Sequence, residues 1–74
     1  MMTSSDFLKL SIKERKDIAQ RYLLDYAKQS KENNELLILI TKQYINAPSL
    51  EEFINFHLGR KTYAIAFCLA LLGE

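Results

Sequence analysis

The sequence predicts an all-α protein, a compact bundle of four to five short helices that forms a single domain over residues 1–74. Three observations support this prediction. Serine-led helix starts occur at residues 11–14 (SIKE) and 49–52 (SLEE), apolar residues recur at helical spacing over residues 18–27, and an apolar run, YAIAFCLALL, fills residues 63–72. The apolar residues 36–40 could form a buried strand, but no second strand candidate exists to pair with them, which favours a helix.

The first long helix is predicted over residues 12–29. Ser11 and Glu14 fit a capping box, in which each side chain satisfies a free backbone N–H at the start of the helix. Apolar residues from Ile18 to Ala27 form one stripe, and charges of alternating sign follow the opposite side in steps of four residues. The preceding segment SSDFLKL predicts an additional short helical turn, with Ser4 or Ser5 as its cap.

The polar segment SKENN, residues 30–34, is expected to separate this helix from a second one over residues 34–46. That second helix has a broad apolar face, so a central position in the bundle is expected. It ends before Pro48, because a residue that precedes proline is disfavoured in the helical conformation.

The third helix is predicted from the second capping box, at residues 49–52, to about Leu58, with Gly59 as its terminator. Its expected buried side chains are Leu50, Phe53, Ile54 and, at the helix edge, His57. Residues 60–62 then connect it to the last helix, over residues 62–72.

Composition limits the chemistry of the chain. A domain of 74 residues is close to the size at which one core is only just sufficient, so dense packing or self-association is expected. Cys68 is the single cysteine, which excludes a disulfide within the chain, and with His57 it makes too few ligands for a zinc site. No metal or other cofactor is therefore predicted.

Catalysis is not predicted either. His57 and Cys68 are the only pair that could form an activated nucleophile, and the sequence has no motif for an orienting group or an oxyanion site. Glu51 and Glu52 lie in a predicted first helical turn, where the helix dipole explains negative charge. We expect a protein that is not an enzyme.

The location expected from the sequence is the cytoplasm. The start of the chain lacks the pattern of a signal peptide, and a lone cysteine within an apolar run suits a reducing compartment. The apolar run of ten residues would cover about 15 Å as a helix, half of the hydrocarbon thickness of a bilayer, so it is not expected to span a membrane.

The last helix carries the main functional hypothesis. A helix that is apolar on every side must be buried on every side, and three other short helices are expected to leave one face uncovered. That face would meet a second copy of the chain or another protein, and Ala66 and Ala70 would let a second backbone approach closely. We predict a non-catalytic regulatory or inhibitory module that acts through protein–protein contact as a homodimer, or that docks into a larger assembly. The candidate interface residues are Tyr63, Ala66, Phe67, Leu69 and Ala70.

Residues 49–68 support an alternative, a helix-turn-helix regulator that binds DNA. They have the outline of this motif, a short helix, a glycine turn and a second helix, and four residues at the turn would meet the DNA: Arg60, Lys61, Thr62 and Tyr63. Several features depart from the motif. Asn55 stands where a small residue is expected, and the second helix offers few polar side chains to read base edges. With a net charge of +1, the chain as a whole is not strongly basic, as a nucleic-acid-binding domain is expected to be.

Overall fold

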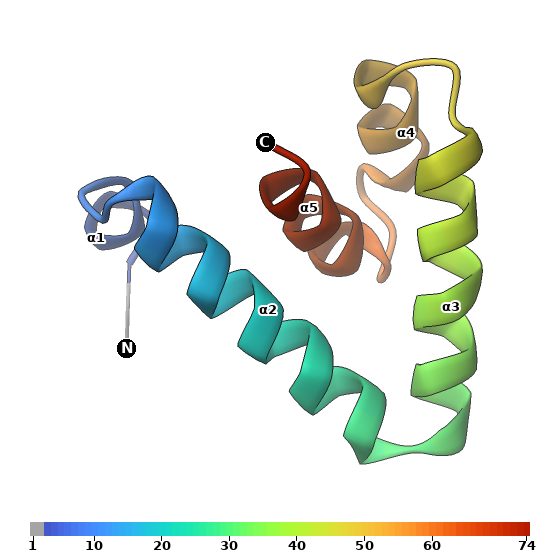
Figure 1. Ribbon diagram of the computed structural model, residues 1–74. Helices are drawn as coiled ribbons and strands as arrows, with labels where there is room; N and C mark the ends of the chain where they lie inside the picture. Colours follow the sequence, from blue (N-terminus) through green and yellow to red (C-terminus); the bar gives the residue numbers. More distant parts are fainter. Residues whose placement is uncertain (1–2) are drawn as a thin grey trace.

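The computed structural model describes residues 3–74, and all regular structure in this range is helical, which confirms the all-α prediction (Figure 1). The five helices are α1 (Ser4–Leu8), α2 (Ile12–Gln29), α3 (Lys31–Asn46), α4 (Leu50–His57) and α5 (Tyr63–Leu72). None of the helices in the described range is both long enough and apolar enough to cross a lipid bilayer.

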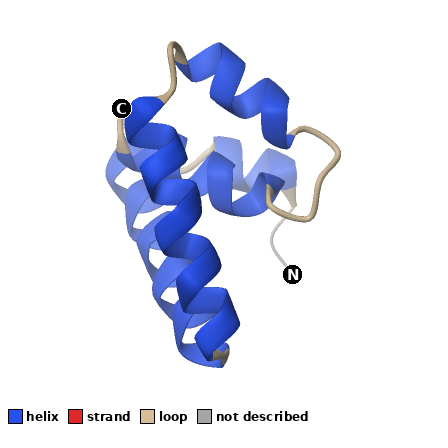
Figure 2. Cartoon of the chain, turned by 90° about the vertical axis from the view of Figure 1, so that its right-hand side faces the viewer, coloured by secondary structure: helices blue, strands red, loops and turns tan. Residues whose placement is uncertain are grey.

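The two long helices form a V, and α5 lies between its arms (Figure 1). The view turned by 90° shows α4 to one side of the two long helices (Figure 2). Helix α5 contacts α2, α3 and α4, whereas α1 lies at the start of α2 and makes few contacts with the rest. The domain measures 30 × 29 × 21 Å.

Hydroxyl side chains cap four of the helices. Ser11 and Glu14 form the complete capping box that the sequence predicts at the start of α2. At α4, only the serine half of the predicted box is present, since the Glu52 N–H donates to Ser49 Oγ. The predicted cap of α1 is wrong, because Thr3 caps that helix, whereas the prediction names Ser4 or Ser5.

The connection between α2 and α3 is shorter than predicted. Ser30 alone is extended, with φ −162° and ψ 161°, and α3 begins at Lys31, three residues before the predicted start. The Asn33 N–H donates to Ser30 Oγ at 3.0 Å, while Asn33 Nδ2 donates to the Tyr26 carbonyl at 3.0 Å. One polar side chain thus satisfies the end of α2 from within the first turn of α3, so no longer loop is needed.

The core joins the four longer helices. Its buried apolar residues are Ala19, Leu23, Ile40, Phe53, Ile65 and Ala66. The prediction that Leu50 is buried is wrong, since its side chain is 48% exposed, and Ile54 is half-buried. Leu50 occupies the first position of α4, and the buried residues of this helix, Phe53 and His57, lie further along it.

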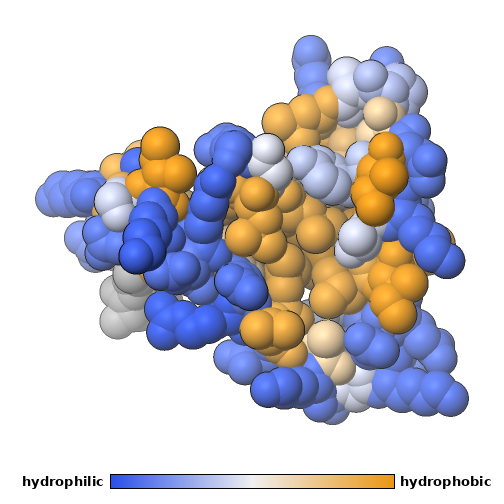
Figure 3. Space-filling model, in the orientation of Figure 1, coloured by the Kyte–Doolittle hydropathy of each residue, from blue (hydrophilic) through white to orange (hydrophobic). Residues whose placement is uncertain are grey.

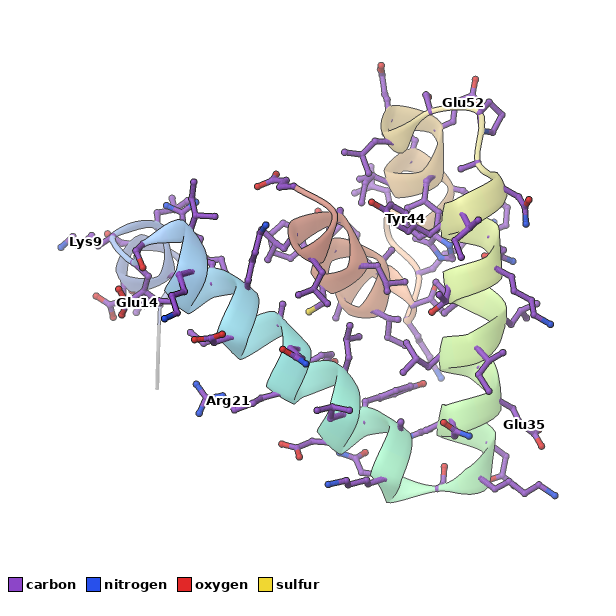
Figure 4. The ribbon with its side chains drawn as sticks, in the orientation of Figure 1. Lys9, Glu14, Arg21, Glu35, Tyr44 and Glu52 are labelled. Atoms are coloured by element: carbon purple, nitrogen blue, oxygen red, sulfur yellow. The ribbon has the colours of Figure 1, made fainter. Side chains whose placement is uncertain are left out.

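Two glycines fix the position of α5. Gly59 has φ +76°, a left-handed conformation that L-residues rarely adopt, and it ends α4 as predicted. At the other end of α5, a side chain on Gly73 would overlap the Tyr44 hydroxyl. Tyr44 reaches from α3 toward α5 (Figure 4). The turn and the close contact together hold α5 between the arms of the V.

Candidate interaction surfaces

The structure separates the five predicted interface residues of α5. Ala66 is completely buried by the chain itself, which removes it from any surface open to a partner. Leu69 is half-buried and packs against the core cluster. Tyr63 and Ala70 are also half-buried. Phe67, at 40% exposed, is the most exposed large apolar side chain of α5. The expected open face of this helix is therefore reduced to the side that carries Phe67.

That side of α5 faces the short helix α1. The Phe67 ring stacks on Tyr63 with 6.2 Å between ring centroids, and Phe7 of α1 approaches it to 6.4 Å. A groove of about 410 Å³ runs between the two helices, lined by Thr3, Ser4, Phe7, Leu8 and Phe67. Arg15 holds α1 in place, since its guanidinium donates to the carbonyls of Leu8 and Leu10 at 2.8 and 3.2 Å.

More apolar area is exposed on α3 than on α5. Ile45 is 72% exposed, Leu39 52% and Ile38 48%, although the sequence predicts a central, buried position for this helix. Hydrophobic surface is visible over α5 and the neighbouring parts of α2 and α3 (Figure 3). Helix α3 does contribute Ile40 to the core, so the prediction holds for one side of the helix only.

Of the four residues of the helix-turn-helix alternative, Arg60 and Lys61 are exposed, and Thr62 and Tyr63 are half-buried. Thr62 is bound to the His57 ring, and the Arg60 guanidinium lies 4.6 Å from the centroid of the Phe56 ring while its Nε donates to the Phe56 carbonyl at 2.7 Å. Lys61 is exposed and Tyr63 stacks on Phe67. The second helix of the motif would be α5, which lies in the middle of the bundle, whereas a recognition helix has to enter the major groove.

His57 links three segments of the chain. Its ring is only 2% exposed, with Nδ1 2.6 Å from Thr62 Oγ1 and Nε2 3.1 Å from Gln43 Oε1. The Gln43 carbonyl oxygen can only accept a hydrogen bond, so Nε2 of His57 carries the proton and donates to it. In this neutral ring Nδ1 has no proton and accepts a hydrogen bond from the Thr62 hydroxyl. Burial, and secondarily the charge of Arg60, lower the pKa of His57, which favours this neutral form.

The structure does not bring the two candidate catalytic residues, His57 and Cys68, together as a hydrogen-bonded pair. Both His57 nitrogens are hydrogen-bonded to Gln43 and Thr62, so the ring is not paired with Cys68. Burial raises the pKa of the half-buried Cys68 thiol, which disfavours the reactive thiolate. Within residues 3–74, no three metal-ligating side chains come together.

A cleft of about 320 Å³ lies beside His57, between the end of α3 and one side of α4. Its lining residues are Gln43, Ala47, Pro48, Glu52, Phe53, Phe56 and His57. The sequence does not predict this cleft, because the residues that form it come from two helices and the proline turn between them. Its one signal in the sequence is the i, i+4 spacing of Glu52 and Phe56, which places a carboxylate and an aromatic ring on one side of α4.

No known protein family matches this chain, and neither the curated proteins nor the solved structures contain a detectable relative.

Proposed function

We propose that this chain is a non-catalytic protein that acts through protein–protein contact, and that its first partner is a second copy of itself. The observation that carries the proposal is the exposure of Ile38 and Ile45 on α3. They lie seven residues apart, which places them on the same side of the helix, two turns from each other.

Thr41 completes this surface, which we call the α3 stripe (Ile38, Thr41 and Ile45). The Thr41 hydroxyl donates to the Leu37 carbonyl at 2.7 Å, so its polar group is satisfied within the helix. Thr41 lies three residues after Ile38 and four before Ile45. The spacing i, i+3, i+7 is the one that forms the seam between two packed helices. The α3 stripe thus has the pattern of a helix–helix contact, and Ile38 and Ile45 are left exposed by the residues that the structure describes.

A second copy suits the α3 stripe for two reasons. In a twofold-symmetric dimer with antiparallel α3 helices, Ile38 of one copy lies opposite Ile45 of the other, so the stripe is complementary to itself. The net charge of +1 gives two copies little overall repulsion. The exposed Lys42 lies on the same side of α3, so its long side chain has to extend past the edge of the contact. A half-buried thiol in a chain with one cysteine also fits the cytoplasm, where we propose that the protein acts.

Sedimentation velocity of matched variants tests the proposal. We expect the wild type to sediment as a dimer at micromolar concentration, and Ile38→Glu with Ile45→Glu to sediment as a folded monomer with an unchanged helical circular dichroism spectrum. Leu39→Glu is the matched control, because Leu39 is as exposed as Ile38 but projects from another side of α3. It should remain a dimer.

Phe67→Glu distinguishes an interface on the α3 stripe from one on α5, the surface that the sequence favours. If Phe67→Glu dissociates the dimer and the α3 variants do not, the interface lies on the groove between α1 and α5. A wild-type protein that remains a compact 8.6 kDa monomer at micromolar concentration would contradict the homodimer itself.

A further inference from the structure

The cleft between α3 and α4 has the size and lining of a small binding site. Its volume of about 320 Å³ lies at the lower end of the range for ligand pockets, and most of its lining is apolar. Phe53 and Phe56 supply aromatic walls, and Ala47 and Pro48 supply the turn that closes one end.

Glu52 is the only charged residue that lines the cleft. Its backbone N–H is bound to Ser49, but within the described chain no hydrogen bond or ion pair engages its carboxylate. Both nitrogens of the His57 ring are engaged, by Gln43 Oε1 and the Thr62 hydroxyl, which leaves the neutral Gln43 amide NH2 as the other polar group that a ligand can meet. A ligand in the cleft therefore meets one free negative charge beside aromatic rings.

Two neighbouring residues, His57 and Arg60, hold the Phe56 ring in position. Arg60 lies 4.6 Å from the centroid of the Phe56 ring and donates to the Phe56 carbonyl, and the His57 ring meets Phe56 nearly edge-on, at 82°. The ring is 56% exposed, so this support leaves a large part of it accessible. A fixed aromatic wall loses little conformational entropy when a ligand binds.

We propose that this cleft binds a small organic cation, an ammonium group attached to an aryl or short alkyl body, with Glu52 facing the ammonium and Phe53 and Phe56 packing against the body. The Glu52 carboxylate attracts the ammonium group, and the aromatic side chains give apolar contact to the body. Arg60 already lies over one face of Phe56, so the attraction for the cation is assigned to Glu52. The site is independent of the α3 stripe, because Gln43 projects from the opposite side of α3 to Ile38 and Ile45.

Benzylamine, benzyl alcohol and benzoate are suitable probes, since they share one ring and differ in charge. In titrations of the ¹⁵N-labelled full chain at neutral pH, we expect benzylamine to shift the backbone amide signals of the cleft residues at millimolar concentration. Benzyl alcohol should bind more weakly, and benzoate should cause no saturable shifts there.

Glu52→Gln and Glu51→Gln form a matched pair, because both residues are exposed and lie in the first turn of α4, but only Glu52 lines the cleft. We expect Glu52→Gln to weaken benzylamine binding by about threefold to fivefold, the range for a partly solvated ion pair, and Glu51→Gln to leave it unchanged. Sedimentation of the protein should not change when benzylamine is added.

Three results would overturn the proposal: no saturable shifts in the cleft with benzylamine, equal weakening by both substitutions, or equal binding of benzoate. None of them bears on dimerisation through the α3 stripe, so a failure here is distinguishable from a failure of the proposed function.

Discussion

Helices α3 and α5 hold the two most apolar segments of the chain, LLILI and YAIAFCLALL, yet the two helices differ in how far their apolar side chains are buried. Helix α5 lies between the arms of the V, and Phe67 is its most exposed large apolar residue. Helix α3 forms an arm of the V, and three of its isoleucine and leucine side chains are about half exposed or more. Burial in this domain depends on where a helix lies in the bundle, and apolar composition alone does not determine it.

The largest expected effect comes from a charge placed inside α5. Ala66 has no exposed surface, so Ala66→Glu would bury an unpaired carboxylate at a cost of several kcal/mol, comparable to the whole stability of a small domain. We expect this variant to be unfolded by circular dichroism. Ala64→Glu, at an exposed position of the same helix, should fold. A folded Ala66→Glu protein would show that α5 is not the centre of the bundle.

A pair of identical substitutions compares the two sides of α3. Ile40 is 1% exposed and Ile45 72%. We expect Ile40→Ala to lower the free energy of unfolding by about 2–5 kcal/mol and Ile45→Ala by about 0.5 kcal/mol or less. Urea denaturation in an Ile38→Glu background, at a concentration where sedimentation shows the protein to be monomeric, measures both. Equal losses would mean that Ile45 is covered.

A smaller effect is expected at the turn that leads into α5. No atom lies within 4 Å of the position that a side chain on Gly59 would occupy, so Gly59→Ala has only the cost of the left-handed backbone, about 1–2 kcal/mol. Thermal melting should show this loss, and Gly59→Asn should lose less because asparagine tolerates this conformation better. A neutral Gly59→Ala would imply that the turn can rearrange without moving α5.

The smallest effect is a pH dependence that arises beside α5. The pKa of His57 is lowered in the folded protein, so the unfolded chain binds a proton at higher pH, near the ordinary value of 6.5. The folded state should therefore lose stability as the pH falls below about 6.5. Melting temperatures across this range should decline less in His57→Gln. A parallel decline in both proteins would assign the effect to other groups.

Local features of the fold follow from the sequence, and the non-local ones do not. Ser11 and Glu14 predict the start of α2 correctly, because a capping box involves only residues three apart. The sequence gives no comparable signal for the burial of Ala66 or the bonding of His57 to Gln43, fourteen residues away, since both depend on how separate helices meet. The sequence does not predict the exposure of the α3 stripe for the same reason: the pattern of α3 shows apolar residues on several sides but not which side is covered.

Ser30, the single extended residue between α2 and α3, has a consequence for the kinetics of folding. Contacts between these helices close a very short loop, whereas the contacts of α2 with α5 join segments more than thirty residues apart. Short loops cost little entropy to close, so the α2–α3 hairpin is expected to form before the transition state and the docking of α5 after it. Substitutions near Ser30 should then slow folding, and those at the contacts of α5 should mainly accelerate unfolding.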